Sequence, residues 1–187
     1  MRIRQILQRV TEELGACFAG LREDELQALE DAIHAADRVF VAGAGRSLLM
    51  VRGLAMRLMQ LGFSAYVVGE TVTPAILPGD LLVIASGSGA TGTLAVVAQK
   101  CKAAGARLAL ITTRPDSPIG ALADLIVEVR AATTKGVPSA AKSLQPGANT
   151  FEQSVLLIGD AIVIDIIGSG NLDETNAELM KRHANLE

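Results

Sequence analysis

Five short and almost uninterrupted apolar runs constrain the fold of this chain more than any other feature of its sequence. They cover residues 38–42, 64–68, 81–85, 107–111 and 125–129. Patterns of helical length lie between several of them, at residues 48–61 and 93–104, with a shorter one at 119–123. Apolar strands that alternate with helices are typical of a parallel sheet that is covered on both faces. We therefore predict an α/β fold, a doubly wound five-stranded parallel sheet with helices on both faces.

Further helices are predicted on both sides of this core. Apolar residues recur at helical spacing within residues 1–36, which we assign to an N-terminal helical extension. Residues 151–167 are apolar enough for a buried helix, and residues 173–182 predict a polar-faced final helix. A chain of 187 residues, half of them hydrophobic, can bury one large core, so we expect a single domain over residues 1–187.

The composition argues against several classes of partner. The net charge is −3, the basic residues are scattered, and only 3% of the residues are aromatic, which disfavours binding of nucleic acid. The N-terminus has no apolar signal core, and Asp160 and Asp165 interrupt the longest apolar stretch, which disfavours secretion and membrane insertion. We expect a cytoplasmic protein with no nucleic-acid and no membrane partner, in which Cys17 and Cys101 are reduced and structural.

A serine- and glycine-rich loop follows the third apolar run. It reads Ser86-Gly87-Ser88-Gly89-Ala90-Thr91 and ends where the next helical pattern begins. Glycines let the backbone approach an anion closely, and hydroxyls and the free N–H groups of a helix start donate to phosphate oxygens. The alternative is an ordinary strand-to-helix turn, which needs only one capping hydroxyl. The loop therefore predicts a phosphate site that needs no metal.

A second glycine turn, Gly43-Ala44-Gly45-Arg46-Ser47, follows the first apolar run. It is similar to part of a dinucleotide-binding fingerprint, and Glu70 at the end of the second run could bind a ribose. Leu48, however, occupies the position of the third glycine, and the serine-rich loop has no role in such a site. We expect no nicotinamide and no other cofactor.

Several motifs together resemble those of the 6-phospho-3-hexuloisomerase family, whose members have a sugar isomerase (SIS) domain. They are the two loops above, Gly69-Glu70-Thr71-Val72-Thr73-Pro74-Ala75, Phe151-Glu152-Gln153 and Arg182-His183-Ala184-Asn185-Leu186-Glu187. The serine-glycine loop is common to SIS domains, whereas the Phe-Glu-Gln triplet and the C-terminal motif are specific to this family. One departure is Gln145-Pro146-Gly147-Ala148, where the family commonly has Gln-Pro-Met-Gly.

This resemblance implies a reaction, a site and an assembly. The reaction interconverts 3-hexulose 6-phosphate and fructose 6-phosphate, the second step of formaldehyde fixation in the ribulose monophosphate pathway. The assembly is one of identical subunits, usually a tetramer. The implied phosphate site, extended by the neighbouring glycine turn, gives as substrate-binding residues Gly45, Arg46, Ser47, Ser86, Gly87, Ser88, Gly89, Ala90 and Thr91.

Glu152 is the candidate for the base that such an isomerase needs. Moving a carbonyl from C3 to C2 requires removal of the C2 proton, a 2,3-enediol, and return of a proton at C3. Thr150 and Gln153 have the spacing of a capping box, which predicts Glu152 in the first turn of a helix, where negative charge is favoured. The alternative role of Glu152 is to complement the helix dipole alone. Arg46 could neutralise phosphate or enediolate charge.

His183 is the second catalytic candidate, because it could assist ring opening or polarise the carbonyl. The alternative is a solvated surface histidine. Neither His183 nor His34 has the spacing of a metal ligand, so we predict no metal. The long aperiodic segment 131–150 contains Lys135 and Lys142, which could close over the substrate.

Two other functions remain open at this stage. One is an SIS isomerase that acts on another phosphosugar, and fold analogy cannot separate it from the first. The other is a non-catalytic module that senses a sugar phosphate. Such modules usually accompany a DNA-binding domain, and residues 1–36 contain no basic recognition helix.

Overall fold

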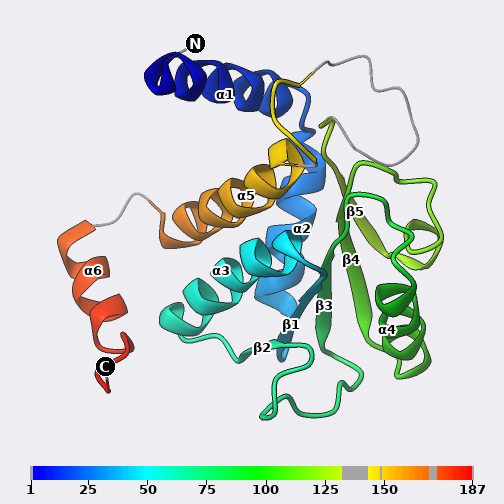
Figure 1. Cartoon of the computed structure of the whole chain (residues 1–187). Helices are drawn as coiled ribbons and strands as arrows, with labels where there is room; N and C mark the ends of the chain where they lie inside the picture. Colours follow the sequence, from blue (N-terminus) through cyan, green and yellow to red (C-terminus); the bar gives the residue numbers. More distant parts are fainter. Residues whose placement is uncertain (1, 132–142, 148, 169–171, 187) are drawn as a thin grey trace.

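A five-stranded parallel sheet lies at the centre of the molecule (Figure 1). The computed structural model describes residues 2–131, 143–147, 149–168 and 172–186. All pairs of neighbouring strands are parallel, in the order β2-β1-β3-β4-β5, so the predicted sheet is confirmed. The strands are β1 (Val39–Gly43), β2 (Ala65–Val67), β3 (Leu81–Ala85), β4 (Arg107–Thr112) and β5 (Leu125–Glu128).

The helices follow the predicted pattern closely. The short pattern at residues 119–123 forms only a single 3-10 turn, η1 (Gly120–Leu122). The α-helices are α1 (Ile3–Phe18), α2 (Glu23–Ala35), α3 (Arg46–Leu61), α4 (Gly92–Ala103), α5 (Asn149–Ile167) and α6 (Leu172–Met180). None of the helices in the described part of the chain is both long and apolar enough to cross a bilayer.

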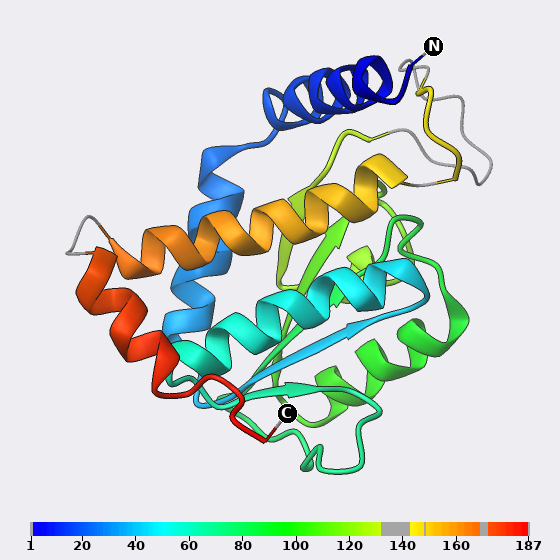
Figure 2. The same cartoon turned by 60° about the vertical axis from the view of Figure 1, so that its left-hand side comes forward.

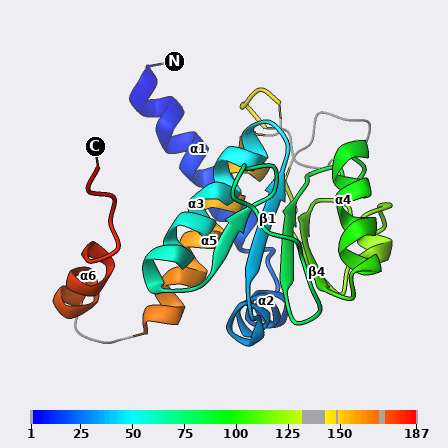
Figure 3. The same ribbon diagram turned by 90° about the horizontal axis from the view of Figure 1, so that it is seen from below.

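The sheet separates two hydrophobic cores, as Figure 3 shows with α3 and α5 on one side and α4 on the other. Val39 and Val41 of β1 point into the larger core, which contains residues of α1, α2, α3 and α5. Phe40 and Ala42 point into the smaller core beneath α4 and η1. Successive strand residues face opposite sides of a sheet, so a strand that is buried on both sides must be apolar throughout. This explains the uninterrupted apolar runs and confirms helices on both faces.

The strand order reverses between β1 and β3. From β1 the chain passes through α3 to β2 at one edge, and from β3 it passes through α4 on the other face to β4. Such a reversal opens a crevice at the carboxyl ends of the two central strands. The last residues of these strands, Gly43 and Ala85, are register partners. The two glycine-containing loops therefore leave the sheet side by side, at the edge of this crevice.

Both cysteines are buried and free. Cys101 belongs to α4 and points into the smaller core, and burial raises the pKa of its thiol to about 11. Burial likewise raises the pKa of the Cys17 thiol, against a weaker opposing effect of the Ser154 hydroxyl. A thiol with a raised pKa holds little thiolate and reacts slowly. Both side chains therefore contribute to packing, in agreement with the sequence-based expectation.

Candidate active site

The turn after β1 brings the start of α3 to the crevice. A Cβ at Gly43 would lie 2.8 Å from the backbone nitrogen of Leu48, so only glycine lets α3 begin so close to the strand. Gly45 is the N-cap residue of α3 and has a φ of +57°, a conformation that glycine adopts without strain. No side chain caps this helix among the described residues. The first N–H groups of α3, next to Arg46 and Ser47, are thus available to an anion.

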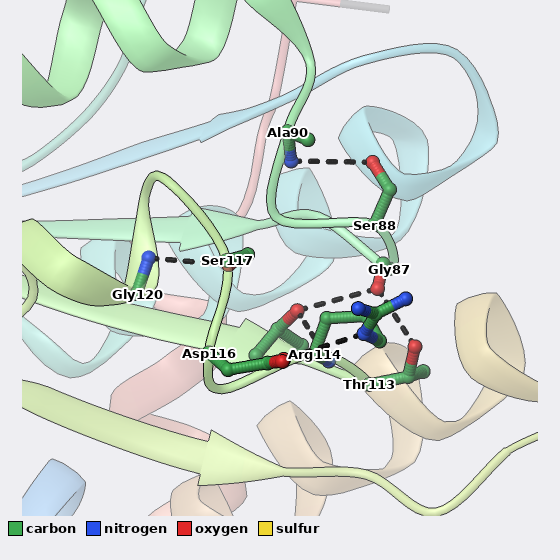
Figure 4. Close-up of polar contacts among 9 residues, drawn as sticks. Gly87, Ser88, Ala90, Thr113, Arg114, Asp116, Ser117 and Gly120 are labelled. Carbon is green, nitrogen blue, oxygen red and sulfur yellow. Dashed lines mark hydrogen bonds and ion pairs between the residues drawn. The ribbon is translucent and has the colours of Figure 1, made fainter. Parts of the chain in front are cut away.

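The segment that follows β4 contacts the serine-glycine loop and donates hydrogen bonds to it (Figure 4). The hydroxyl of Thr113 donates to the carbonyl oxygen of Gly87 at 2.8 Å, and the backbone N–H of Thr113 donates to the same oxygen at 3.2 Å. Gly89 has a φ of +57°, and a Cβ there would lie 1.9 Å from Oγ of Ser117. The loop is therefore fixed by tight packing at Gly89 and by the two hydrogen bonds from Thr113 to the carbonyl oxygen of Gly87.

Those hydroxyls remain in position to bind a ligand. Thr91 is the N-cap residue of α4, yet its side chain makes no capping hydrogen bond. Its Oγ1 lies 3.5 Å from Oγ of the buried Ser86. Oγ of Ser88 accepts a long hydrogen bond from the N–H of Ala90, which leaves the hydroxyl proton of Ser88 to donate elsewhere. An ordinary capped turn would use a hydroxyl for α4, so this geometry favours the phosphate site.

The first turn of α5 completes the crevice. Phe151 is fully buried against the loop, and a Cβ at Gly87 would lie 3.2 Å from its ring. Asn149 accepts a hydrogen bond of 2.5 Å from the guanidinium of Arg46 through its Oδ1. The Nε of Arg46 also lies 3.0 Å from Oε2 of Glu152. The N-termini of α3, α4 and α5 thus lie around the crevice, and each contributes the positive end of a helix dipole.

Glu152 pairs with Arg46 through a buried carboxylate oxygen, Oε2. Its side chain is 14% exposed, against 48% for Arg46. Oε2 is buried and accepts no aligned hydrogen bond from the described residues, so the contact with Arg46 is an ion pair only. A carboxylate oxygen without an aligned donor retains its lone pairs for a proton. Glu152 therefore stays the candidate for the general base.

The predicted position of Glu152 is confirmed, but the predicted cause is wrong. Glu152 lies in the first turn of α5. The helix already begins at Asn149, so Thr150 is a helical residue and not the cap. Its hydroxyl instead accepts a hydrogen bond from Nε2 of Gln145 at 3.2 Å, and Oε1 of Gln153 has no partner among the described residues. The capping box therefore does not form.

His183 lies far from Glu152 within the chain. The preceding residue, Arg182, donates to the carbonyl oxygen of Gln60 at 3.4 Å, in the last turn of α3. Arg46 begins the same helix, whose 16 residues span about 24 Å. His183 is exposed, and Figure 2 shows the segment that follows α6 passing the end of α3 that lies away from the start of α5. One chain alone does not bring the two catalytic candidates together.

A cavity of about 550 Å³ opens beside the serine-glycine loop, and sequence reasoning missed its basic residue. Arg114 is the second residue after the end of β4, and its Nε lies 3.3 Å from Oδ1 of Asp116 (Figure 4). A charged residue just after an apolar strand is the signal that could have found it, since strand ends of this kind line the crevice. The cavity is lined by Ser88, Ala90, Thr91, Gly92, Arg114, Asp116, Ser117 and Pro118.

The remaining candidates have other positions. Glu70, the residue that could have bound a ribose, forms an ion pair with Arg52 of α3. Its carboxylate is therefore already paired. Lys135 and Lys142 lie outside the described residues. Among the residues that are described, no group of three or more His, Cys, Asp or Glu side chains is placed to hold a metal ion.

Comparisons with known proteins identify the family of this chain. The family model of the SIS domain matches residues 32–158. A 3-hexulose-6-phosphate isomerase of Bacillus subtilis is 37% identical over 187 residues, which cover all of both chains. One of Mycobacterium gastri is 41% identical over 97% of this chain and 89% of its own.

Among solved structures, a protein of Methanococcus jannaschii superposes on this chain with a TM-score of 0.83. A molecular function of 3-hexulose-6-phosphate isomerase was inferred for that protein from its structure. It is 33% identical and covers 98% of this chain and 99% of its own. These relatives match over almost their whole length, including the helices outside the SIS model. The chain belongs to the SIS-domain family, within the group of the 3-hexulose-6-phosphate isomerases.

Proposed function

We propose that this protein interconverts 3-hexulose 6-phosphate and fructose 6-phosphate, the reaction also named 6-phospho-3-hexuloisomerase and assigned above to the ribulose monophosphate pathway. The observation that carries the proposal is the position of Glu152, whose buried Oε2 accepts no aligned hydrogen bond from the described residues at the edge of the phosphate loop. A phosphate loop alone would support binding only. A carboxylate beside it supplies the base for proton transfer.

The substrate is held by its phosphate. The dianion lies on residues 86–91, where the hydroxyls of Ser88 and Thr91 and the first N–H groups of α4 donate to its oxygens. Ser47 and the start of α3 contact it from the other side of the crevice. The positive ends of α3, α4 and α5 favour negative charge there without a metal. This anchoring directs the sugar carbons toward Glu152.

The reaction then moves one proton between adjacent carbons. Oε2 of Glu152 takes the proton from C2, and the electrons of the broken C–H bond form the C2–C3 double bond while the C3 carbonyl oxygen becomes negative. Arg46, 3.0 Å from the carboxylate, stabilises this enediolate. A proton passes from the C2 hydroxyl to the C3 oxygen, and Glu152 returns its proton to C3. The product has its carbonyl at C2, and no electrons leave the sugar.

The protein acts as a cytoplasmic homo-oligomer, a tetramer as in the family that it resembles. Large apolar side chains are exposed along α1, α3 and α5 in the single chain, which supports burial between subunits. In such an assembly His183 of one subunit reaches the crevice of the next and assists ring opening or polarises the carbonyl. The far position of His183 within its own chain supports this arrangement. The exposed residues are Ile3, Leu7, Leu49, Met56, Met59, Leu157 and Ile164.

A direct assay tests the proposed reaction. Purified protein is supplied with 3-hexulose 6-phosphate, and fructose 6-phosphate is followed with coupled dehydrogenases. Turnover in deuterated water should also place deuterium at C3 of the product, because the acid form of Glu152 exchanges with solvent. Absence of turnover by folded protein would exclude this reaction. Turnover of a different phosphosugar instead would assign the chain to another SIS isomerase activity.

A further inference from the structure

Helix α1 lies outside the part of the chain that the SIS model matches, and it contacts the segment that leads into α5. This segment, residues 143–147, comes just before the helix that carries Glu152. Figure 1 shows α1 beside the start of α5. The contact therefore connects α1, which has no role in the mechanism proposed above, to the helix that carries Glu152, the proposed general base.

A single carboxylate makes most of this contact. Oε2 of Glu13 accepts hydrogen bonds from the hydroxyl of Ser143 at 2.7 Å and from Nε2 of Gln145 at 3.3 Å. Oε1 of Glu13 accepts one from the backbone N–H of Leu144 at 2.9 Å. An ionised carboxylate accepts such hydrogen bonds through both oxygens, and bonds to a charged group are stronger than neutral ones. Glu13 thereby fixes three successive residues of the segment.

The contact continues into α5. Nε2 of Gln145 also donates to Oγ1 of Thr150, in the turn that carries Glu152. One turn further, the hydroxyl of Ser154 lies 2.7 Å from the carbonyl oxygen of Thr150 and 3.6 Å from Sγ of Cys17 in α1. Two contacts, a polar one at Glu13 and a packed one at Cys17, thus fix the start of α5 against α1.

The charge state of Glu13 agrees with this role. Partial burial opposes ionisation of Glu13. The hydrogen bonds from Leu144, Ser143 and Gln145, together with Arg9, outweigh burial and hold the pKa of Glu13 below its usual value. The carboxylate is therefore ionised at neutral pH, in the form that accepts all three bonds.

We propose that Glu13 is a positioning residue for the isomerase reaction: it holds residues 143–145 and, through Gln145 and Thr150, sets the place of Glu152 relative to the phosphate loop. This inference rests on the proposed function of Glu152. A displacement of about 1 Å in a catalytic group can lower a rate by about 100-fold. Helix α1 therefore supports the start of α5 through Glu13, although it contributes no group that touches the substrate.

The test compares Glu13→Ala with Glu12→Ala, a change at the exposed neighbouring residue of the same helix. Alanine favours the helix in both variants, so only the contact differs. We expect kcat of Glu13→Ala to fall by about tenfold to 100-fold, with a smaller change in KM, because the phosphate loop is untouched. Glu12→Ala should retain wild-type kcat. Equal kcat values in the two variants would overturn the proposal, and so would a lower melting temperature with unchanged kcat.

Two further measurements keep the test decisive. Gln145→Ala breaks the link to Thr150 from outside α1, and its effect on kcat should not add to that of Glu13→Ala, because both act through one contact. Additive effects would contradict the proposal. Hydrogen exchange of a peptide over residues 143–154 should be faster in Glu13→Ala and unchanged in Glu12→Ala. This readout needs no turnover, so it tests the contact even where the wild-type protein fails the isomerase assay, an outcome that would instead refute the proposed function.

Discussion

Arg46 and Glu152 face each other from the first turns of α3 and α5, with Nε and Oε2 3.0 Å apart. The arginine is about half exposed and the glutamate mostly buried. An ion pair with one exposed partner contributes about 0–1 kcal/mol to stability, so stability does not explain this contact. The contact instead places a positive charge beside Glu152, the base of the proposed reaction.

Replacement of Arg46 by alanine should lower kcat/KM at least about tenfold, because a preorganised charge near a developing oxyanion contributes on the order of 3 kcal/mol. Arg46→Lys should recover part of this loss, since it keeps the charge but not the planar fork. The matched control is Arg52→Ala on the same helix, where the arginine pairs with Glu70. We expect wild-type kcat/KM for that control in the coupled assay. Equal losses in the two alanine variants would argue against a specific role of Arg46.

Replacement of Glu152 by glutamine should remove the base and retain the shape of the site. We expect kcat to fall by about 100-fold to 10,000-fold, while competitive inhibition by inorganic phosphate stays within about twofold of wild type. Asp160→Asn, a change of the same kind further along α5, serves as the control and should leave kcat unchanged. Near-normal turnover of Glu152→Gln would move the base to another residue, with His183 the next candidate.

Replacement of Ser88 by alanine should weaken phosphate binding. A hydrogen bond to a charged group is worth about 1.5–3 kcal/mol, which corresponds to an increase in KM of about tenfold or more. The decrease in kcat should be no larger than this increase in KM, because the contact is the same in the ground state and the transition state. Measurement of kcat and KM, with the inhibition constant of inorganic phosphate, separates the two effects. A large loss of kcat at constant KM would assign Ser88 to the chemical step.

Replacement of Gly89 by alanine should destabilise the fold. The φ of +57° costs an alanine about 1–2 kcal/mol, and its Cβ would overlap Oγ of Ser117 at 1.9 Å. Thermal unfolding should show a melting temperature at least about 4 °C below wild type. Gly92→Ala is the matched control, because no atom lies within 4 Å of a Cβ there and the residue begins α4. The control should melt at or above the wild-type temperature, and a similar decrease in both variants would contradict the steric argument.

Local pattern was enough to predict the strands and the position of the serine-glycine loop. Residues 81–85 are apolar because both faces of β3 are buried, and this requirement is visible in the sequence itself. Residues 86–91 directly follow β3, and ligands of such sheets bind at the carboxyl ends of the strands, so the position of this loop at the crevice can also be predicted. The pairing of Arg46 with Glu152 and Asn149 was not predictable in the same way, since it depends on how α5 packs against α3.

Two errors of sequence reasoning have the same origin. The capping-box spacing of Thr150 and Gln153 is real, but Gln145 binds the hydroxyl of Thr150 and the helix begins earlier. A tertiary contact thus overrides a local motif. Glu13 carried no signal, because a glutamate on the polar side of an amphipathic helix has the same appearance whether it is solvated or bound to a distant segment.

The place of His183 leads to a prediction about pairs of subunits. Alone, Glu152→Gln should lose most of its activity, and His183→Ala should lie at least about tenfold below wild type in kcat. In a site built from Glu152 of one subunit and His183 of another, co-expression of the two variants creates some sites in which both groups are intact. With random assembly of equal amounts, about a quarter of the sites regain both groups, and kcat should rise to about a quarter of the wild-type value.

The control for this experiment is co-expression of wild type with the double variant Glu152→Gln/His183→Ala, which contains the same two changes on one chain. Differently tagged subunits, purified over both tags, establish that mixed assemblies have formed. If mixed assemblies of the single variants show no recovery, His183 does not complete a neighbouring site. Recovery requires that each crevice receives its histidine from another copy, because the C-terminal segment packs on the end of α3 that lies a whole helix away from Arg46 in its own subunit.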